Sequence, residues 1–136
     1  MIERIQGNEE SQAKEVARVI VDAIANGDYK LIEETADSMG EGAWTAEDIG
    51  ELIENFKADN ELDCFDTYDT VCKFNPTYLD GSQYKQENFY HFNDGSGFRY
   101  EYALTSQGEL NDLTLMLIFL YRGDGIEVQF EDLHVL

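Results

Sequence analysis

The chain has 136 residues, of which 29 are acidic and 9 are basic, so its formal net charge is −20. This length is typical of one domain, and we expect residues 1–136 to fold as one α+β unit. Hydrophobic residues make up 43% of the chain, which is too many for an acidic disordered tail. The charge argues against binding to nucleic acid or to an anionic membrane, because both require clustered Lys and Arg.

The N-terminus lacks the basic segment and the apolar stretch of a signal peptide. The longest apolar run, Leu115–Tyr121, is too short to cross a bilayer as a helix. We therefore expect a cytoplasmic protein without a membrane partner. Cys64 and Cys72 are too few for a disulfide scaffold, and we interpret them as buried thiols, with a redox or metal pair as the alternative.

Apolar residues in the first sixty positions follow helical spacing. A first helix is predicted from about Asn8 to Asn26, with Gly27 in the left-handed conformation that ends it. Asp28 is then predicted to cap a short second helix. The expected buried set of that helix is Tyr29, Leu31 and Ile32.

A third helix is predicted to begin at Thr45, because Thr45 and Asp48 have the spacing of a capping box. Its apolar stripe follows the same helical period and consists of Ile49, Leu52, Ile53 and Phe56. No linker follows this helix, but the hydrophobic pattern changes near residue 61 from helical spacing to alternation.

The second half of the chain is divided by turn signals at regular intervals. They fall at Asn75–Ser82, Asn93–Gly97, Thr105–Gly108 and Arg122–Gly125. The runs between them have the length of strands in an antiparallel meander, and a further strand is expected around Phe65–Phe74. The prediction is an α+β fold in which about three N-terminal helices pack on a curved antiparallel meander sheet of four to five strands.

The last predicted strand, Gly125–Val135, changes the parity of its alternation. Apolar residues fall on even positions up to Phe130 and then on odd positions from Leu133. Because a slip of one residue would turn the final apolar side chains to the wrong face, we predict a β-bulge near Glu131 and Asp132.

The distribution of charge is the most distinctive feature of the sequence. Residues 31–56 contain eight acids and no base, and residues 58–72 contain five more acids and no base. One interpretation is a solubilising surface; the other is a surface that captures a basic protein partner. The partner-binding residues predicted are Trp44, Glu47, Asp48, Glu51, Glu54 and Asp59. Trp44 would serve as an anchor, although it could equally close the end of the core.

A pocket between helices and sheet is the alternative site, where a carboxylate could act as an acid or base. The residues proposed for it lie in or beside strands and are His91, Tyr100, Glu101, Tyr102 and Asp112. Nothing in the sequence brings them together, and the aromatic stripe among them is also typical of core. The acids at 63, 66 and 69 do not have calcium-loop spacing, so no metal and no cofactor is expected.

Three helices followed by a long antiparallel meander resemble the cystatin-like and nuclear-transport-factor-2-like cone folds. This superfamily contains isomerases, dehydratases, carrier domains and binding modules, and its enzymes usually carry an Asp, His or Tyr inside the cone. The segments Asn111–Leu115 and Glu131–Leu136 look like the tail of a small uncharacterised bacterial family. The acidic character resembles that of immunity proteins, which neutralise toxins by offering an acidic surface in place of nucleic acid.

The leading hypothesis is a non-enzymatic, immunity-like binding protein that holds a basic protein partner. The alternative is a cone-fold small-ligand-binding protein, or an acid–base enzyme, with its pocket between the helices and the sheet. A homodimer through the exposed face of the sheet is compatible with both hypotheses.

Overall fold

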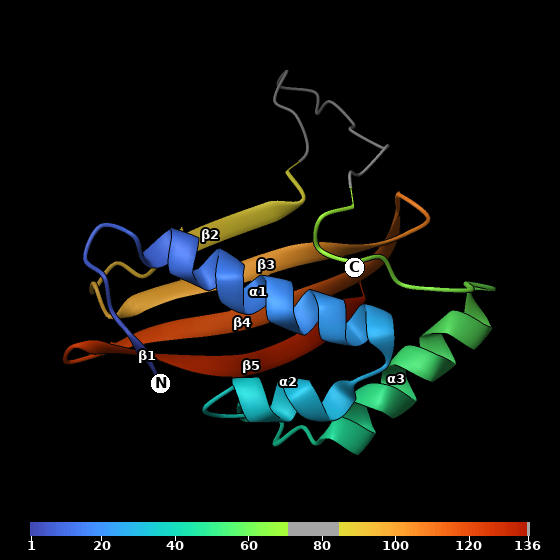
Figure 1. Cartoon of the computed structure of the whole chain (residues 1–136), viewed down its shortest axis with the longest axis horizontal. Helices are drawn as coiled ribbons and strands as arrows, with labels where there is room; N and C mark the ends of the chain where they lie inside the picture. Colours follow the sequence, from blue (N-terminus) through green and yellow to red (C-terminus); the bar gives the residue numbers. More distant parts are fainter. Residues whose placement is uncertain (71–84, 136) are drawn as a thin grey trace.

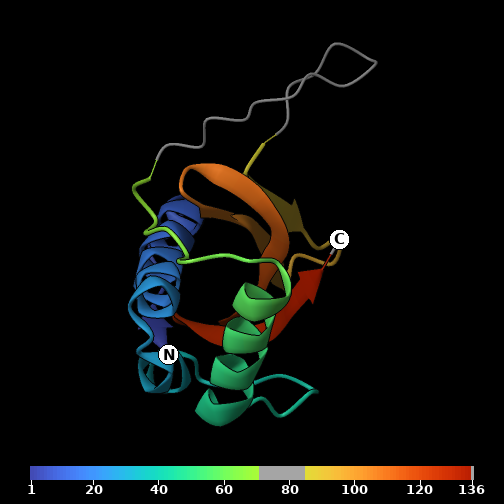
Figure 2. The same cartoon turned by 90° about the vertical axis from the view of Figure 1, so that its right-hand side faces the viewer.

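The computed structural model describes residues 1–70 and 85–135. Five strands form an open antiparallel sheet in the order β1-β5-β4-β3-β2, and the helices pack on one of its faces (Figures 1 and 2). The strands are β1 (Ile2–Glu3), β2 (Glu87–His91), β3 (Gly97–Ser106), β4 (Glu109–Arg122) and β5 (Gly125–Val135). The helices are α1 (Glu9–Asn26), α2 (Tyr29–Thr35) and α3 (Ala46–Asp59). The predicted α+β class is confirmed.

Helices α1 and α2 lie where the sequence pattern placed them. Gly27 has a φ of 73° and ends α1 in the left-handed conformation, as predicted. The prediction for Asp28 was wrong in its mechanism: the residue precedes α2, but its side chain makes no capping hydrogen bond. Ile32 is fully buried, whereas Tyr29 and Leu31 are only half-buried.

Helix α3 begins with the predicted capping box. The backbone N–H of Asp48 donates to Thr45 Oγ1 at 3.1 Å, and the backbone N–H of Thr45 donates to Asp48 Oδ2 at 3.0 Å. Ile49 and Ile53 are fully buried, because they point from α3 into the core. The box thus satisfies two backbone donors that a helix N-terminus leaves without intrahelical partners.

The predicted meander is confirmed for β2 to β5, but the strand expected around Phe65–Phe74 was wrong over its described part. Residues 65–70 form a loop, and the remainder of that prediction lies outside the described residues. Hydrogen bonds to two carboxylates hold this loop in place of the hydrogen-bond ladder of a strand. Asp66 binds the β3–β4 turn, and Tyr68 N–H donates to Asp22 Oδ1 at 2.8 Å. The fifth strand is β1, which pairs with β5 at Ile126 and Gly125.

The bulge predicted in the last strand is present. Met116 pairs with Asp132 and Leu117 pairs with Phe130, so Glu131 is the extra residue. The bulge turns Leu133 back to the buried face, where only 4% of it is exposed. A second register shift, between Ala103 and Thr105 of β3, was not predicted.

The core lies between the helices and the inner face of the sheet. Its largest fully buried side chains include Ile20, Ile32, Ile49, Ile53, Phe98, Tyr100, Leu117, Phe119 and Phe130. The opposite face of the sheet carries Met116, Ile118 and Leu120, which are half-buried beside one another on β4. We call this the outer face (Figure 2).

Candidate functional site

Helix α3 presents a line of carboxylates on the side away from its apolar stripe. Glu47, Glu51 and Glu54 are spaced at i, i+4 and i+7, so they lie on one face of the helix, and all three are exposed. We call these residues the α3 stripe. Asp59, the last residue of α3, is also exposed.

Two of the acids predicted to bind a partner also have structural contacts. Asp48 completes the capping box. Glu54 accepts a hydrogen bond from the Tyr29 hydroxyl at 3.1 Å and lies 3.3 Å from Lys57 Nζ. Burial and this hydrogen bond raise the pKa of Tyr29 to about 12, so its hydroxyl stays protonated at neutral pH. Glu47, Glu51 and Asp59 have no hydrogen bond or ion pair within residues 1–70 and 85–135.

Trp44 closes one end of the core. Its ring packs edge-on against Phe130, with 5.6 Å between ring centroids, and it is half-buried. Gly42 lies so close to the indole that a Cβ at that position would stand 2.9 Å from Nε1. The structure therefore places most of Trp44 against the fold, directly before the N-terminus of α3.

Acidic residues after α3 attach the loop at residues 65–70 to β3, to the β3–β4 turn and to α1. Asp66 accepts hydrogen bonds from Thr105 Oγ1 at 2.8 Å, from Gln107 N–H at 3.0 Å and from Gly108 N–H at 2.7 Å. Asp69 forms an ion pair with Arg18 of α1 at 2.6 Å. These two carboxylates thus have partners within the chain, whereas Glu47 and Glu51 of the α3 stripe have none among the described residues.

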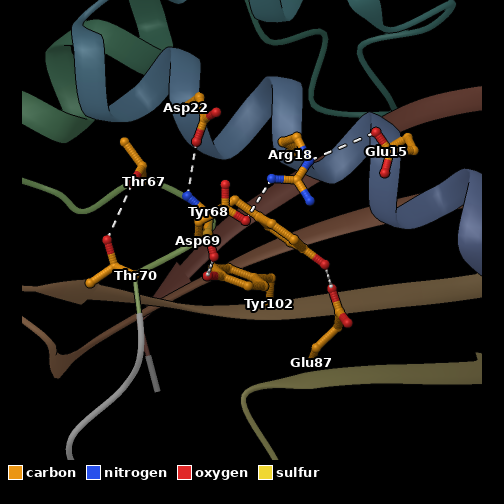
Figure 3. Close-up of polar contacts among 9 residues, drawn as sticks. All are labelled: Glu15, Arg18, Asp22, Thr67, Tyr68, Asp69, Thr70, Glu87 and Tyr102. Atoms are coloured by element: carbon orange, nitrogen blue, oxygen red, sulfur yellow. Dashed lines mark hydrogen bonds and ion pairs between the residues drawn. The ribbon is translucent and has the colours of Figure 1, made fainter.

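A second polar centre lies between α1, the loop at 65–70 and strands β2 and β3 (Figure 3). Glu87 Oε2 accepts hydrogen bonds from the hydroxyls of Tyr68, at 2.5 Å, and Tyr100, at 2.6 Å. The ring of Tyr68 stacks on Tyr102 with centroids 5.3 Å apart. We call Tyr68, Glu87, Tyr100 and Tyr102 the Glu87 cluster. Lys14 approaches it from α1, with Nζ 3.6 Å from Glu87 Oε1.

Burial governs the electrostatics of the Glu87 cluster. It raises the pKa of Tyr100 and of Tyr68 far above the ordinary value, and the hydrogen bonds to Glu87 raise both further. Both phenols therefore stay protonated across the physiological range and act as donors. Arg18, whose guanidinium carbon lies 4.9 Å from the Tyr68 ring centroid, covers the loop side of this tyrosine.

The five residues proposed for a pocket do not converge on one point. Tyr100 and Tyr102 lie on the inner face of β3, whereas Glu101 lies on the outer face. His91 is on the edge strand β2, where its Nε2 lies 2.5 Å from Glu10 Oε2. Asp112 is exposed on β4 and has a φ of 70°.

Glu87 was not among the residues proposed from the sequence. The alternation of Glu87, Phe89 and His91 contains the signal that could have identified it, because strand residues two apart share a face. The sequence does not show where this strand begins, because the turn signal at Asn75–Ser82 ends several residues before it.

Two surface grooves are lined by residues outside the α3 stripe and the Glu87 cluster. One, of about 380 Å³, lies between β1 and α1 and is lined by Ile2, Glu3, Gln12, Glu15, Val16, Val19 and Thr35. The other, of about 220 Å³, is lined by Asn60, Leu62, Ser106, Glu109, Leu110, Asn111 and Asp112. Asp112 is thus the one proposed pocket residue that lines either of these two grooves.

Within residues 1–70 and 85–135, no three His, Cys, Asp or Glu side chains are arranged to hold a metal ion. No helix in these ranges has the length and the apolar character needed to cross a membrane. Cys64 is a free, half-buried thiol, and Cys72 lies outside the described residues.

The fold defines an α+β protein with three helices on one face of a five-stranded antiparallel sheet. The chain belongs to the family described as "Domain of unknown function (DUF7668)", whose model matches residues 21–136. Comparisons with curated proteins and with solved structures found no match.

Proposed function

We propose that this protein is a non-enzymatic, immunity-like binding protein that holds a basic protein partner through the α3 stripe and Asp59. The observation that carries the proposal is the run of exposed carboxylates on α3, of which Glu47, Glu51 and Asp59 have no partner in the described chain. A cytoplasmic location is part of the same proposal.

The net charge supports the proposal because it exceeds what solubility requires. A charge of magnitude about 2 to 8 keeps a small domain soluble, whereas this chain has a charge of −20. Unopposed acids repel one another and reduce stability, so a surface of this kind has a cost in the free protein. A basic partner would offset that cost and would be steered toward the surface by the electric field.

The attachment of α3 to the fold supports the proposal as well. Its N-terminus is held by the capping box, and Glu33 Oε2 accepts a hydrogen bond from the backbone N–H of Ala46 at 2.8 Å. Ile49 and Ile53 fasten the helix to the core. The α3 stripe is therefore pre-organised, which reduces the entropy that a partner must overcome on binding.

The proposal is tested by capture from the lysate of the native host with three baits. The first is the wild-type protein, and the second is the stripe variant Glu47→Gln, Glu51→Gln and Asp59→Asn, which leaves Asp48 and Glu54 in their structural contacts. The third is a control that removes the same charge elsewhere, by Glu109→Gln, Asp112→Asn and Asp124→Asn. These three control residues are exposed and lie outside α3.

We expect a basic protein to be retained by the wild-type and control baits at low salt and to be lost from the stripe variant. Equal retention on all three baits would contradict the assignment of the surface. A captured protein that is acidic, or that resists elution by salt, would contradict the electrostatic mechanism.

A second function is favoured by the Glu87 cluster, because it provides a half-buried carboxylate of the kind that a ligand-binding or acid–base cone would require. The α+β architecture is compatible with a cone-like fold of the cystatin-like or nuclear-transport-factor-2-like kind. In this alternative a small polar ligand would displace Tyr68 from Glu87 and Tyr102, entering beside Lys14, whose side chain is 48% exposed.

The alternative is tested by a thermal-shift screen of small ligands, since binding to the native state raises the melting temperature. A ligand of this site should stabilise the wild-type protein and the outer-face control Glu101→Gln, but not Glu87→Gln. A ligand that stabilises Glu87→Gln equally would bind elsewhere.

A further inference from the structure

Strand β2 forms one edge of the sheet, and its hydrogen-bonding pattern shows which groups point outward. Phe92 N–H donates to Gly97 O and Ala103 N–H donates to Gln86 O, both at 2.9 Å. Bonded pairs alternate with non-bonded pairs in an antiparallel ladder. The backbone groups of Glu87, Phe89 and His91 therefore point away from β3, and β2 pairs with no other strand in the described part of the chain.

We infer that this edge is an interface for a second copy of the chain, formed by antiparallel pairing of β2 with the partner's β2 about Phe89. In this register all three outward-pointing residues meet outward-pointing residues. Phe89 lies opposite the partner's Phe89, and Glu87 lies opposite the partner's His91. Each of these pairs can exchange both of its backbone hydrogen bonds, so the two sheets become one.

The side chains are self-complementary in this register. Glu87 lies opposite an imidazole and not opposite a second carboxylate, so the register brings no like charges face to face. Within each chain Glu87 keeps its hydrogen bonds from Tyr68 and Tyr100, and His91 keeps its contact with Glu10. On the outer face, Asn88 lies opposite the partner's Tyr90. Tyr90 is 51% exposed in the isolated chain and is one of the few large hydrophobic side chains open to solvent in residues 1–70 and 85–135. A register shifted by two residues would place Phe89 opposite the partner's Glu87 or the partner's His91. It would also form one fewer pair between outward-pointing residues of the two strands.

The net charge of the chain opposes this association and gives it a characteristic dependence on salt. Two chains of charge −20 repel each other, and added salt screens that repulsion. The dimer should therefore become tighter as salt increases. This is the opposite of the behaviour proposed for a basic partner, so the two interactions are separable in one set of buffers.

The interface is tested by amide hydrogen exchange of the wild-type full chain, measured by NMR from micromolar to millimolar concentration in about 1 M NaCl, where the Debye length is about 3 Å. Amides of Asn88 and Tyr90 are bonded to β3 and should be protected at every concentration. Amides of Glu87, Phe89 and His91 should become protected only as the dimer forms. Light scattering on the same samples reports the mass.

Variants then test the edge against the outer face. His91→Pro removes an N–H that points away from β3, so it breaks no backbone hydrogen bond within the chain, although it removes the imidazole that contacts Glu10. It should weaken the dimer about tenfold or more, because two hydrogen bonds are lost per dimer. His91→Ala keeps the N–H and serves as its control, and it should weaken the dimer less. Ile118→Lys on the outer face should leave the dimer intact.

A protein that stays monomeric at millimolar concentration in high salt would overturn the inference. So would a dimer whose Glu87, Phe89 and His91 amides exchange freely, or one that is dispersed by Ile118→Lys and not by His91→Pro. If His91→Pro does not fold, the exchange pattern of the wild-type protein decides the question alone.

Discussion

Asp66 illustrates how a single acidic side chain can serve the fold in a chain with excess negative charge. It receives one hydroxyl and two backbone N–H groups from the β3–β4 turn, and its own N–H donates to Thr105 O at 2.9 Å. The loop after α3 is thereby attached to the far end of the sheet. The charge on Asp66 is thus compensated locally, whereas no residue in the described part of the chain compensates the charge on Glu47 and Glu51.

We expect Asp66→Ala to lower the free energy of unfolding by about 1 to 3 kcal/mol, because three donors lose their acceptor. Chemical denaturation monitored by circular dichroism measures the change. Asp63→Ala is the matched control, since Asp63 is exposed and makes no hydrogen bond in the described chain. Its effect should stay within about 0.5 kcal/mol. Equal effects of the two substitutions would show that the Asp66 contacts contribute nothing.

Tyr100 should make the protein sensitive to alkali. Burial raises the pKa of this phenol in the folded state far above about 10, the value in the unfolded chain. The unfolded state therefore loses its proton first as pH rises, and stability falls above pH 10. By pH 11 this amounts to about 1.4 kcal/mol for one tyrosine that stays protonated when folded. Tyr100→Phe should remove that part of the decline, as measured by urea unfolding at pH 8 and pH 11. If the unfolding free energy of Tyr100→Phe declines between pH 8 and pH 11 as much as that of the wild-type protein, Tyr100 is not the cause of the decline.

At the scale of elements, the helix that carries the proposed binding surface, α3, also contributes to the stability of the protein through its N-terminal cap. Thr45→Ala removes the acceptor for Asp48 N–H and should cost about 1 kcal/mol of unfolding free energy. Thr45→Ser should restore most of it, because serine offers the same oxygen. Hydrogen exchange should locate the loss in the first turn of α3. Loss spread evenly over the protein would argue against a local capping effect.

The elements that can be predicted from the sequence are the helices whose apolar residues keep a regular spacing over several turns and the strands whose apolar residues alternate strictly. The capping box of α3 and the bulge at Glu131 are predictable because nearby residues alone determine each of them. The free N–H groups at the start of a helix require a cap, and a shift of one residue in the apolar alternation requires an extra residue in the strand. The strand expected around Phe65–Phe74 is not formed over its described part, because Asp66 and Tyr68 obtain tertiary partners that outweigh a weak strand pattern. Strand β1 has two residues, too few to show any period.

The candidate sites were predictable to different degrees. Exposure of the α3 stripe follows from the helical period and from the charges of its residues. The alternation in β2 places Glu87 on the same face as Phe89. The Glu87 cluster as a whole does not follow from the sequence, because it joins a loop, an edge strand and a central strand that are far apart in the sequence. Its members were drawn together by burial of the tyrosine rings, and the carboxylate accompanies them as a hydrogen-bond acceptor.

At the scale of the whole molecule, the charge should give two associations with opposite dependence on salt. Binding of a basic partner should weaken as salt rises, whereas self-association through β2 should strengthen. Sedimentation of the protein alone, and of its mixture with the captured partner, over a series of salt concentrations measures both. Parallel trends would show that at least one of the two surfaces is misassigned.

The most direct test of the α3 stripe is the association rate of the captured basic partner with the wild-type protein and with the stripe variant, measured by stopped flow across a range of salt concentrations. The account predicts a rate for the wild-type protein that falls steeply with salt, a variant about tenfold slower at low salt, and convergence of the two at high salt. A stripe variant that associates as fast as the wild-type protein at low salt would contradict it.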